Sequence, residues 1–104
     1  MYVIIWEYQV KTDRTADFEQ IYHSNGAWAE LFRTGTGYIS TELLRDKMQP
    51  QKYITIDQWQ SAKDYETFLA KFNKEYETLD GQCKGRTEHE ILLGKWESVN
   101  NETR

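Results

Sequence analysis

The sequence has few of the residues that build disulfide frameworks and rigid loops, with one cysteine and one proline in 104 residues. A lone cysteine excludes an intrachain disulfide and is typical of a reducing compartment. There is no basic block and the formal net charge is -4, which argues against binding along a nucleic-acid backbone. No apolar run approaches the length of a membrane span, and the N-terminal residues lack the pattern of a secretion signal. We therefore expect a cytoplasmic protein that binds neither nucleic acid nor membrane.

Aromatic residues, by contrast, are abundant: they make up 14% of the chain, with seven tyrosines and four tryptophans. Such rings can line a pocket while their O–H and N–H groups still find hydrogen-bond partners. The hydrophobic share is only 38%, so the core must come from the spacing of apolar residues rather than from their number. The length suits one domain. We expect this domain over residues 1–97, followed by a polar tail over residues 98–104.

Four segments have the composition of β-strands, namely residues 2–10, 38–46, 52–59 and 86–97. A helical region after Thr12 and Asp13 is interrupted at Asn25 and restarts at Trp28. A second begins after Ser61 and keeps apolar residues at helical spacing as far as residue 79, with Asp64 in the capping-box position. The order β-α-β-β-α-β predicts an α+β protein with the ferredoxin-like fold, a four-stranded antiparallel sheet with both helical regions on one face.

The strands are apolar on both faces, whereas a sheet covered on one face alternates apolar with polar residues. Strict alternation gives the following opposed sets: Tyr2, Ile4, Trp6, Tyr8 and Val10 against Val3 and Ile5; Tyr38 and Leu44 against Ile39 and Leu43; Tyr53 and Trp59 against Ile54 and Ile56; Leu92 and Trp96 against Ile91 and Leu93. Two helical regions can cover only one face. We expect a second copy of the chain to cover the other, giving a homodimer through the sheet face.

Most signatures of catalytic chemistry are missing from the sequence. His23 and His89 have no carboxylate or cysteine at metal-ligand spacing, and Cys83 has no partner histidine nearby. Glu88 and Glu90 share one face of the last strand, where a solvated strand end is a simpler interpretation than an acid-base pair. We therefore predict no metal site and no bound cofactor.

Three segments nevertheless form a distinctive set: YVIIWEY in the first strand, GYIS at the start of the second, and the pattern W-Q-S-x-x-D-Y-x-x-F that begins at Trp59. Together they resemble one known family, the antibiotic biosynthesis monooxygenase (ABM) superfamily of dimeric α+β barrels. The resemblance covers about residues 2–97. It implies that two sheets pack as a dimeric α+β barrel.

The resemblance also implies a site. In the cofactor-independent oxygenases of this family, a Trp ends the third strand and a Tyr follows six residues later, and Trp59 and Tyr65 match this pair. We take both as candidate catalytic residues. Those enzymes have an Asn four residues before the Trp, where this chain has Thr55, which cannot present an amide. The candidate substrate-binding residues on the pocket walls are Thr55, Tyr22, Trp28, Phe68 and Phe72.

The family resemblance favours a cofactor-independent monooxygenase that acts on a small aromatic or quinol-type substrate between sheet and helices. The substrate itself would be the reductant. The alternative is a non-catalytic protein that senses or stores a small apolar ligand. Haem binding or degradation is disfavoured, because Glu7, Phe68 and Tyr76 depart from the Asn, Trp and His pattern of the haem-degrading branch. Trp59 and Tyr65 could also be purely structural, packing the sheet against the helix.

Overall fold

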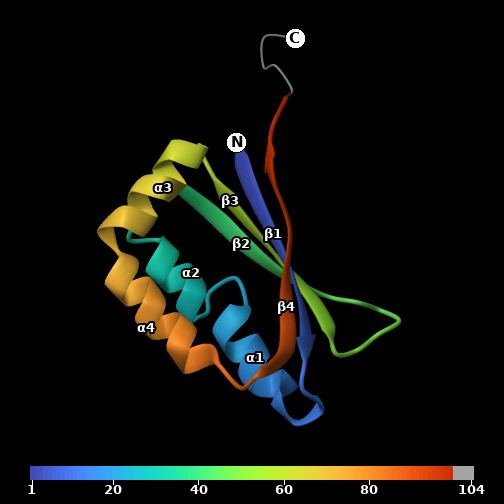
Figure 1. Ribbon diagram of the computed structural model, residues 1–104. Helices are drawn as coiled ribbons and strands as arrows, with labels where there is room; N and C mark the ends of the chain where they lie inside the picture. The colour runs from blue at the N-terminus through green and yellow to red at the C-terminus, as the bar shows by residue number, and fades with distance from the viewer. Residues whose placement is uncertain (100–104) are drawn as a thin grey trace.

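The computed structural model describes residues 1–99 and has one four-stranded antiparallel sheet with helices packed on one of its faces (Figure 1). The strands are β1 (Tyr2–Val10), β2 (Tyr38–Arg45), β3 (Lys52–Trp59) and β4 (Thr87–Glu97). Their order in the sheet is β2-β3-β1-β4, so both central strands are flanked by antiparallel neighbours. This topology confirms the predicted α+β ferredoxin-like fold. Of the predicted tail, residues 100–104 lie outside the described residues.

The first helical region contains a short turn and two helices, η1 (Thr12–Arg14), α1 (Thr15–Tyr22) and α2 (Ala27–Phe32). The second region contains α3 (Ala62–Lys71) and α4 (Asn73–Cys83), which are separated at Phe72. The sequence pattern predicts one continuous helix there, and this prediction is wrong. The break redirects α4 toward α2, so that the ring of Tyr76 meets the ring of Trp28 edge to face at 5.0 Å.

Ser61 caps α3 as predicted, because its Oγ accepts a hydrogen bond from the backbone N–H of Asp64 at 3.1 Å. This bond satisfies one of the donors that a helix start leaves without a partner. The cap fixes the point where the chain leaves β3 and turns onto the helical layer.

The core lies between the sheet and the helices and is built mainly from aromatic rings. Strand alternation turns Tyr53 and Trp59 of β3 toward the helices, where Trp59 is 0% exposed. Its ring lies 5.4 Å from the ring of Tyr65 and 5.2 Å from that of Phe68. These contacts join the end of β3 to α3.

Register shifts in β2 and β4 change which side chains face the helices. In β2 the register shifts between Tyr38 and Ser40, so Leu43 pairs with Thr55 on the helix side and packs on the core. In β4 the register shifts at Leu93, which places Leu92 opposite Trp6. The strict alternation assumed from the sequence is therefore wrong in these two strands, since an extra residue in a strand moves all later side chains to the other face.

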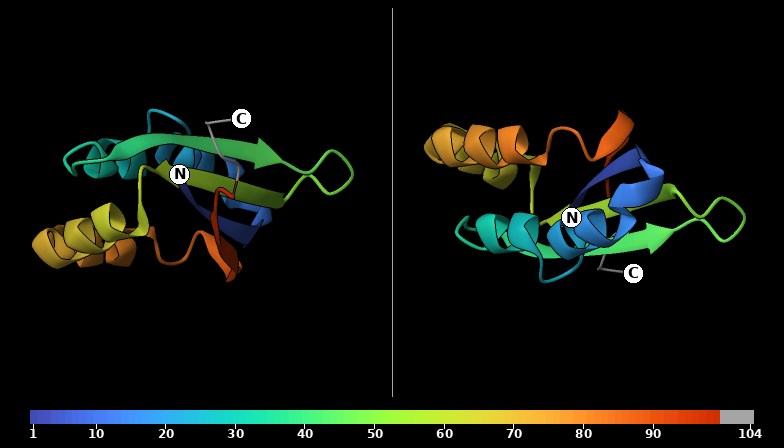
Figure 2. Two further views of the ribbon diagram at one scale, coloured as in Figure 1. Left: turned by 90° about the horizontal axis from the view of Figure 1, so that it is seen from above. Right: turned by 90° about the horizontal axis from the view of Figure 1, so that it is seen from below.

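Within residues 1–99 no helix lies over the opposite face of the sheet (Figure 2). Its apolar side chains, identified from the pairing register, are Val3, Ile5, Leu44, Ile54, Ile56, Ile91 and Trp96. Three of them are well exposed: Leu44 at 46%, Ile91 at 45% and Trp96 at 55%. None of the helices in residues 1–99 is long and apolar enough to cross a membrane.

Candidate active site

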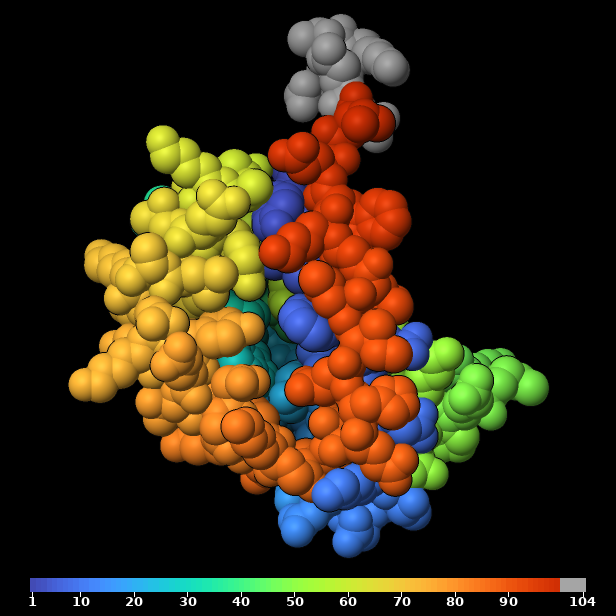
Figure 3. Space-filling view, viewed as in Figure 1, coloured from blue at the N-terminus to red at the C-terminus, as the bar shows by residue number. Residues whose placement is uncertain are grey.

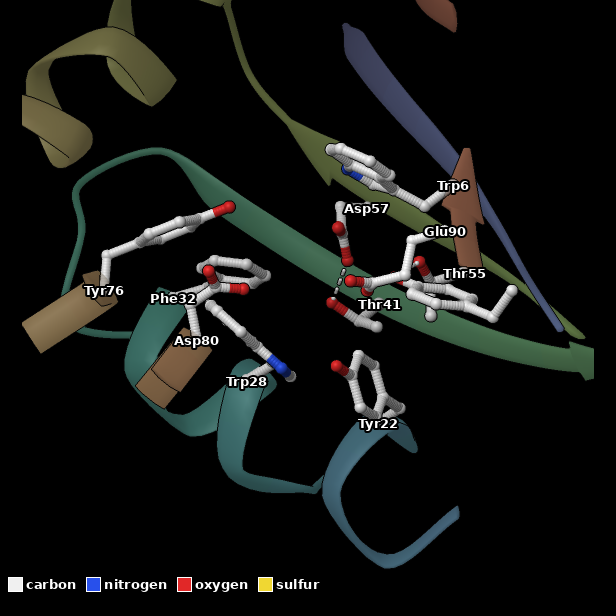
Figure 4. A pocket seen from close by; sticks show the side chains of 11 residues that line it. Trp6, Tyr22, Trp28, Phe32, Thr41, Thr55, Asp57, Tyr76, Asp80 and Glu90 are labelled. Carbon is white, nitrogen blue, oxygen red and sulfur yellow. Dashed lines mark hydrogen bonds between the residues drawn. The ribbon is translucent and has the colours of Figure 1, made fainter. Parts of the chain in front are cut away.

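A pocket of about 80 Å³ lies between the sheet and the helices. The space-filling view shows a hollow between α4 and β4, with parts of β1 and α2 visible at its depth (Figure 3). All four strands and three of the helices contribute to the lining, which consists of Trp6, Tyr8, Tyr22, Trp28, Phe32, Thr41, Thr55, Asp57, Tyr76, Asp80 and Glu90 (Figure 4).

The central polar group of the pocket is the carboxyl of Asp57. It lies on β3 between Thr55 and Trp59 in the alternation that turns side chains toward the helices, and it is only 8% exposed. The hydroxyl of Thr41 donates a hydrogen bond to Asp57 Oδ1 at 2.7 Å, and the hydroxyl of Tyr38 donates to Thr41 Oγ1 at 2.7 Å. Burial raises the pKa of Asp57 to about 6, while the bond from Thr41 acts in the opposite direction. The carboxyl can therefore exchange a proton near neutral pH.

Two tyrosines on the pocket wall stay protonated at neutral pH. The hydroxyls of Tyr8 and Thr55 share a hydrogen bond of 2.9 Å. Burial raises the pKa of Tyr8 well above its ordinary value and also raises the pKa of Tyr22. Both phenols can therefore donate hydrogen bonds, but neither is suited to remove a proton from a substrate.

Trp28 brings an unused hydrogen-bond donor to the same pocket. The residue is 8% exposed, and within residues 1–99 no acceptor bonds to its Nε1. The buried thiol of Cys83 lies near the indole of Trp28 and the hydroxyl of Tyr22, and burial raises the thiol pKa. A neutral thiol is a weak hydrogen-bonding group, so the N–H remains available to a ligand.

Two further carboxyls stand where the pocket opens to solvent. Asp80 comes from α4 and Glu90 from β4, and both residues are exposed. Burial of its carboxyl, with the charge of Asp80 as a second cause, raises the pKa of Glu90. The pocket lining contains no lysine, arginine or histidine.

The structure brings three of the sequence-predicted site residues to this pocket: Thr55, Tyr22 and Trp28. Trp59 and Tyr65 are not part of its lining. Trp59 is fully enclosed, and within residues 1–99 its Nε1 has no acceptor. The hydroxyl of Tyr65 lies beside that of Tyr76, which separates it from the pocket. Burial raises the pKa of Tyr65.

Phe68 and Phe72 line a different hollow, which lies between α3 and the loop at residues 34–36. His23 has a local structural contact, since its Nδ1 accepts the backbone N–H of Asn25 at 3.0 Å. In residues 1–99 no three His, Cys, Asp or Glu side chains are grouped so that they could hold a metal ion.

Sequence reasoning missed Asp57, Asp80 and the position of Glu90 in the pocket. For Asp57 a signal was present: the strand ITIDQW places a carboxyl on the same face as Trp59, where a one-sided sheet should be apolar. Asp80 carries no such signal, since it belongs to an acidic helix segment that resembles an ordinary solvated face. Glu88 and Glu90 were expected to share one face of the last strand, but the register shifts at Glu88, and Glu90 alone pairs with Tyr8 on the helix side. The approach of Glu90 to α4 depends on tertiary packing.

The fold and the pocket define a ferredoxin-like α+β protein with a polar and aromatic pocket between sheet and helices. Residues 1–72 match the family model of the antibiotic biosynthesis monooxygenases, and the chain belongs to this family. No curated protein matches the chain significantly.

Several solved structures have the same fold. A Nitrosomonas europaea protein assigned to the antibiotic biosynthesis monooxygenases aligns with a TM-score of 0.71 at 18% identity, over 96% of this chain and 100% of its own. A mutant of SnoaB, a cofactor-independent oxygenase from Streptomyces nogalater, aligns with a TM-score of 0.70 at 18% identity, over 99% of this chain and 97% of its own. A mutant of MhuD, solved with two manganese protoporphyrin IX molecules per active site, aligns with a TM-score of 0.69 at 16% identity, over 97% of both chains.

Proposed function

We propose that the protein is a cofactor-independent monooxygenase that acts on a small aromatic or quinol-type substrate in this pocket. The observation that carries the proposal is Asp57, a buried carboxyl with a pKa of about 6 that faces an aromatic pocket. A general base is most effective when its pKa lies near the working pH. Membership of the monooxygenase family and the similarity to SnoaB support the same reaction class.

In this mechanism Asp57 takes the proton of a substrate hydroxyl. The resulting quinolate, or the anion of a similarly electron-rich phenol, can reduce dioxygen directly. A hydroquinone ring would gain one oxygen atom, lose two hydrogens and leave as a hydroxyquinone. The second oxygen atom would leave as water, so that the substrate supplies all the electrons. The burial of Asp57, which is 8% exposed, limits its contact with bulk water and keeps the anion close to its partners.

The size of the pocket limits the substrate. Its volume of about 80 Å³ is well below the roughly 300–1,000 Å³ of sites for drug-sized ligands. One aromatic ring fits such a space better than a fused polycycle. Any larger substituent would extend through the opening between α4 and β4.

We predicted Trp59 and Tyr65 as catalytic residues, but both lie outside the pocket lining, and in this proposal they act as packing residues. The ring of Trp59 packs against that of Tyr65, and the hydroxyl of Tyr65 lies beside that of Tyr76 on the pocket wall. In this proposal Thr55, Tyr22 and Trp28 contact the substrate. Phe68 and Phe72 hold α3 against the core, away from the pocket opening.

We also propose that two copies of the chain pack through their uncovered sheet faces. The argument is the apolar surface on that face, which includes Ile5, Ile54, Ile91 and Trp96. Exposed apolar patches of this kind mark interaction surfaces. The pocket opens on the helix side of the sheet, so the dimer would leave it accessible. A cytoplasmic location stays a prediction from the sequence.

A second candidate function is ligand binding without turnover, and the donor of Trp28 favours it. An unused buried N–H beside aromatic rings suits a binding site whether or not chemistry follows. A haem-related role has less support, because the carboxyls of Asp57, Asp80 and Glu90 would repel the propionates of a haem.

Oxygen uptake in isotopically labelled dioxygen tests the proposal. Metal-free protein would be supplied with a panel of single-ring hydroquinones and phenols. The proposal predicts one labelled oxygen atom per product molecule and no need for added flavin or metal. The matched control for the variant Asp57→Asn is Asp17→Asn, since Asp17 is an exposed helix residue paired with Arg14. Binding of these compounds without uptake would favour the second candidate function.

A further inference from the structure

The carboxyl side chains that line the pocket favour a positively charged ligand. Asp57, Asp80 and Glu90 are carboxyls, and no cationic side chain lines the same space. The three come from different elements, β3, α4 and β4. The pocket therefore brings three carboxyls together with no cation in its own lining, at an energetic cost that a bound cation would lower.

Two buried groups point to a ligand independently of this charge. The indole Nε1 of Trp28, in a side chain that is 8% exposed, has no acceptor within residues 1–99 apart from the weakly bonding thiol of Cys83. In the close-up view the nitrogen of Trp28 lies on the side of the indole that faces Tyr22 (Figure 4). Thr41 occupies Oδ1 of Asp57, which leaves Oδ2 available. A ligand hydroxyl could accept from Trp28 and donate to Asp57.

The walls between these polar groups suit a flat ring and a cation. The indoles of Trp6 and Trp28 and the rings of Tyr22 and Tyr76 line the pocket. Aromatic faces attract a nearby ammonium group, and tryptophan is the strongest partner. An ammonium on a short chain would reach the carboxyls at the opening, Asp80 and Glu90.

We propose that the pocket selects a phenol that carries a protonated amine on a short side chain. The phenolic oxygen lies between Trp28 and Asp57, the ring lies among the indoles, and the ammonium lies between Asp80 and Glu90. A carboxylate in place of the amine is rejected by the same charges. This inference rests on the proposed function only in using the same pocket, because selection by charge needs no turnover.

The test compares three probes that differ only at the end of the side chain. They are tyramine, which carries an ammonium, tyrosol, which carries a neutral hydroxyl, and 3-(4-hydroxyphenyl)propionate, which carries a carboxylate. Titration calorimetry on the full chain at neutral pH and low ionic strength should give tyramine a Kd roughly tenfold below that of tyrosol, with still weaker binding of the carboxylate. Added salt should narrow the gap between tyramine and tyrosol, since Asp80 and Glu90 are exposed to solvent.

Substitutions of the carboxyls at the pocket opening show which side chains select the ammonium group. Asp80→Asn and Glu90→Gln should each weaken tyramine by about threefold and leave tyrosol within about twofold, a magnitude typical of exposed charge pairs. The double variant should bind the two probes nearly equally. Glu77→Gln is the matched control, because it removes a carboxylate from α4 outside the pocket lining. Its preference for tyramine should match that of the unmodified protein.

The outcomes separate this inference from the monooxygenase proposal. Equal binding of the three probes, tighter binding of the carboxylate, or no binding of any probe would overturn the charge selection. Oxygen uptake with neutral quinols would still stand in those cases. Selective binding of tyramine without uptake of oxygen by any of the hydroquinones and phenols would support the charge selection and contradict the monooxygenase.

Discussion

At the scale of single residues, Asp57 combines a cost to the fold with the proposed role in catalysis. A carboxyl on the buried face of a strand is desolvated, and the bond from Thr41 compensates only in part. Proteins keep such groups at sites where chemistry needs a shifted pKa. This reasoning leads to two predictions about residues, one on stability and one on the pH dependence of activity.

Asp57→Asn should stabilise the protein at neutral pH. The carboxyl pKa rises from 3.8 to about 6 on folding. Below the lower value the carboxyl is protonated in both states and imposes no penalty. As pH rises, the Asp57 carboxyl ionises first in the unfolded chain, so the free energy of unfolding falls. At pH 7 this decrease is on the order of 3 kcal/mol. Urea unfolding at several pH values should show the gain of the variant at neutral pH and its near disappearance around pH 4. A variant less stable than the wild type at neutral pH would contradict this account.

Thr41→Val should move the pH dependence of activity upward. The hydroxyl of Thr41 lowers the pKa of Asp57 by donating to its carboxylate. A hydrogen bond to a charged group is worth about 1.5–3 kcal/mol, so the midpoint of kcat/KM against pH should rise by about one pH unit. Thr41→Ser keeps the hydroxyl and serves as the control. An unchanged midpoint in Thr41→Val would mean that Asp57 is not the titrating group.

At the scale of elements, the sequence predicted the strands better than the long helical region. The limits of β1 and β3 follow from alternation, turn residues and the start of a capped helix, which are local signals. The break at Phe72 and the shifts at Leu93 and between Tyr38 and Ser40 carry no local signal. They depend on how α4, β4 and β2 pack against residues that are distant in the sequence. Part of the pocket was therefore unpredictable, since Asp80 and Glu90 reach it through these elements.

Ser61→Ala should destabilise the protein through the start of α3. The variant leaves the backbone N–H of Asp64 without the acceptor that Ser61 supplies. Loss of an N-cap costs about 1 kcal/mol, which chemical unfolding can measure. Ser61→Asp keeps an acceptor at this position and should retain most of the stability. Equal loss in both variants would show that the cap bond is not the cause.

At the scale of the whole molecule, one face of the sheet serves the pocket and the other is free for association. The helices cover the inner face, and the outer face presents Ile5, Ile54 and Trp96 among its apolar side chains. The sequence already indicated this division through strands that are apolar on both faces. It could not show the pocket, whose lining comes from residues far apart in the chain.

Light scattering tests the proposed dimer. We expect twice the chain mass of 12.4 kDa at micromolar concentration. Ile54→Glu places a charge in the centre of the uncovered face and should give monomers. Ala70→Glu, on the exposed side of α3, should leave the mass unchanged. A monomeric wild type would contradict the dimer.

The most direct test of the central claim is oxygen uptake by the wild type and Asp57→Asn from about pH 5 to about pH 8. The base requires its ionised form, so wild-type kcat/KM should rise with pH through a midpoint near 6. Asp57→Asn should lose on the order of 10²–10⁴-fold at neutral pH, while circular dichroism shows it folded. Uptake by the variant equal to that of the wild type, with the same pH midpoint, would contradict the role of Asp57 as the base.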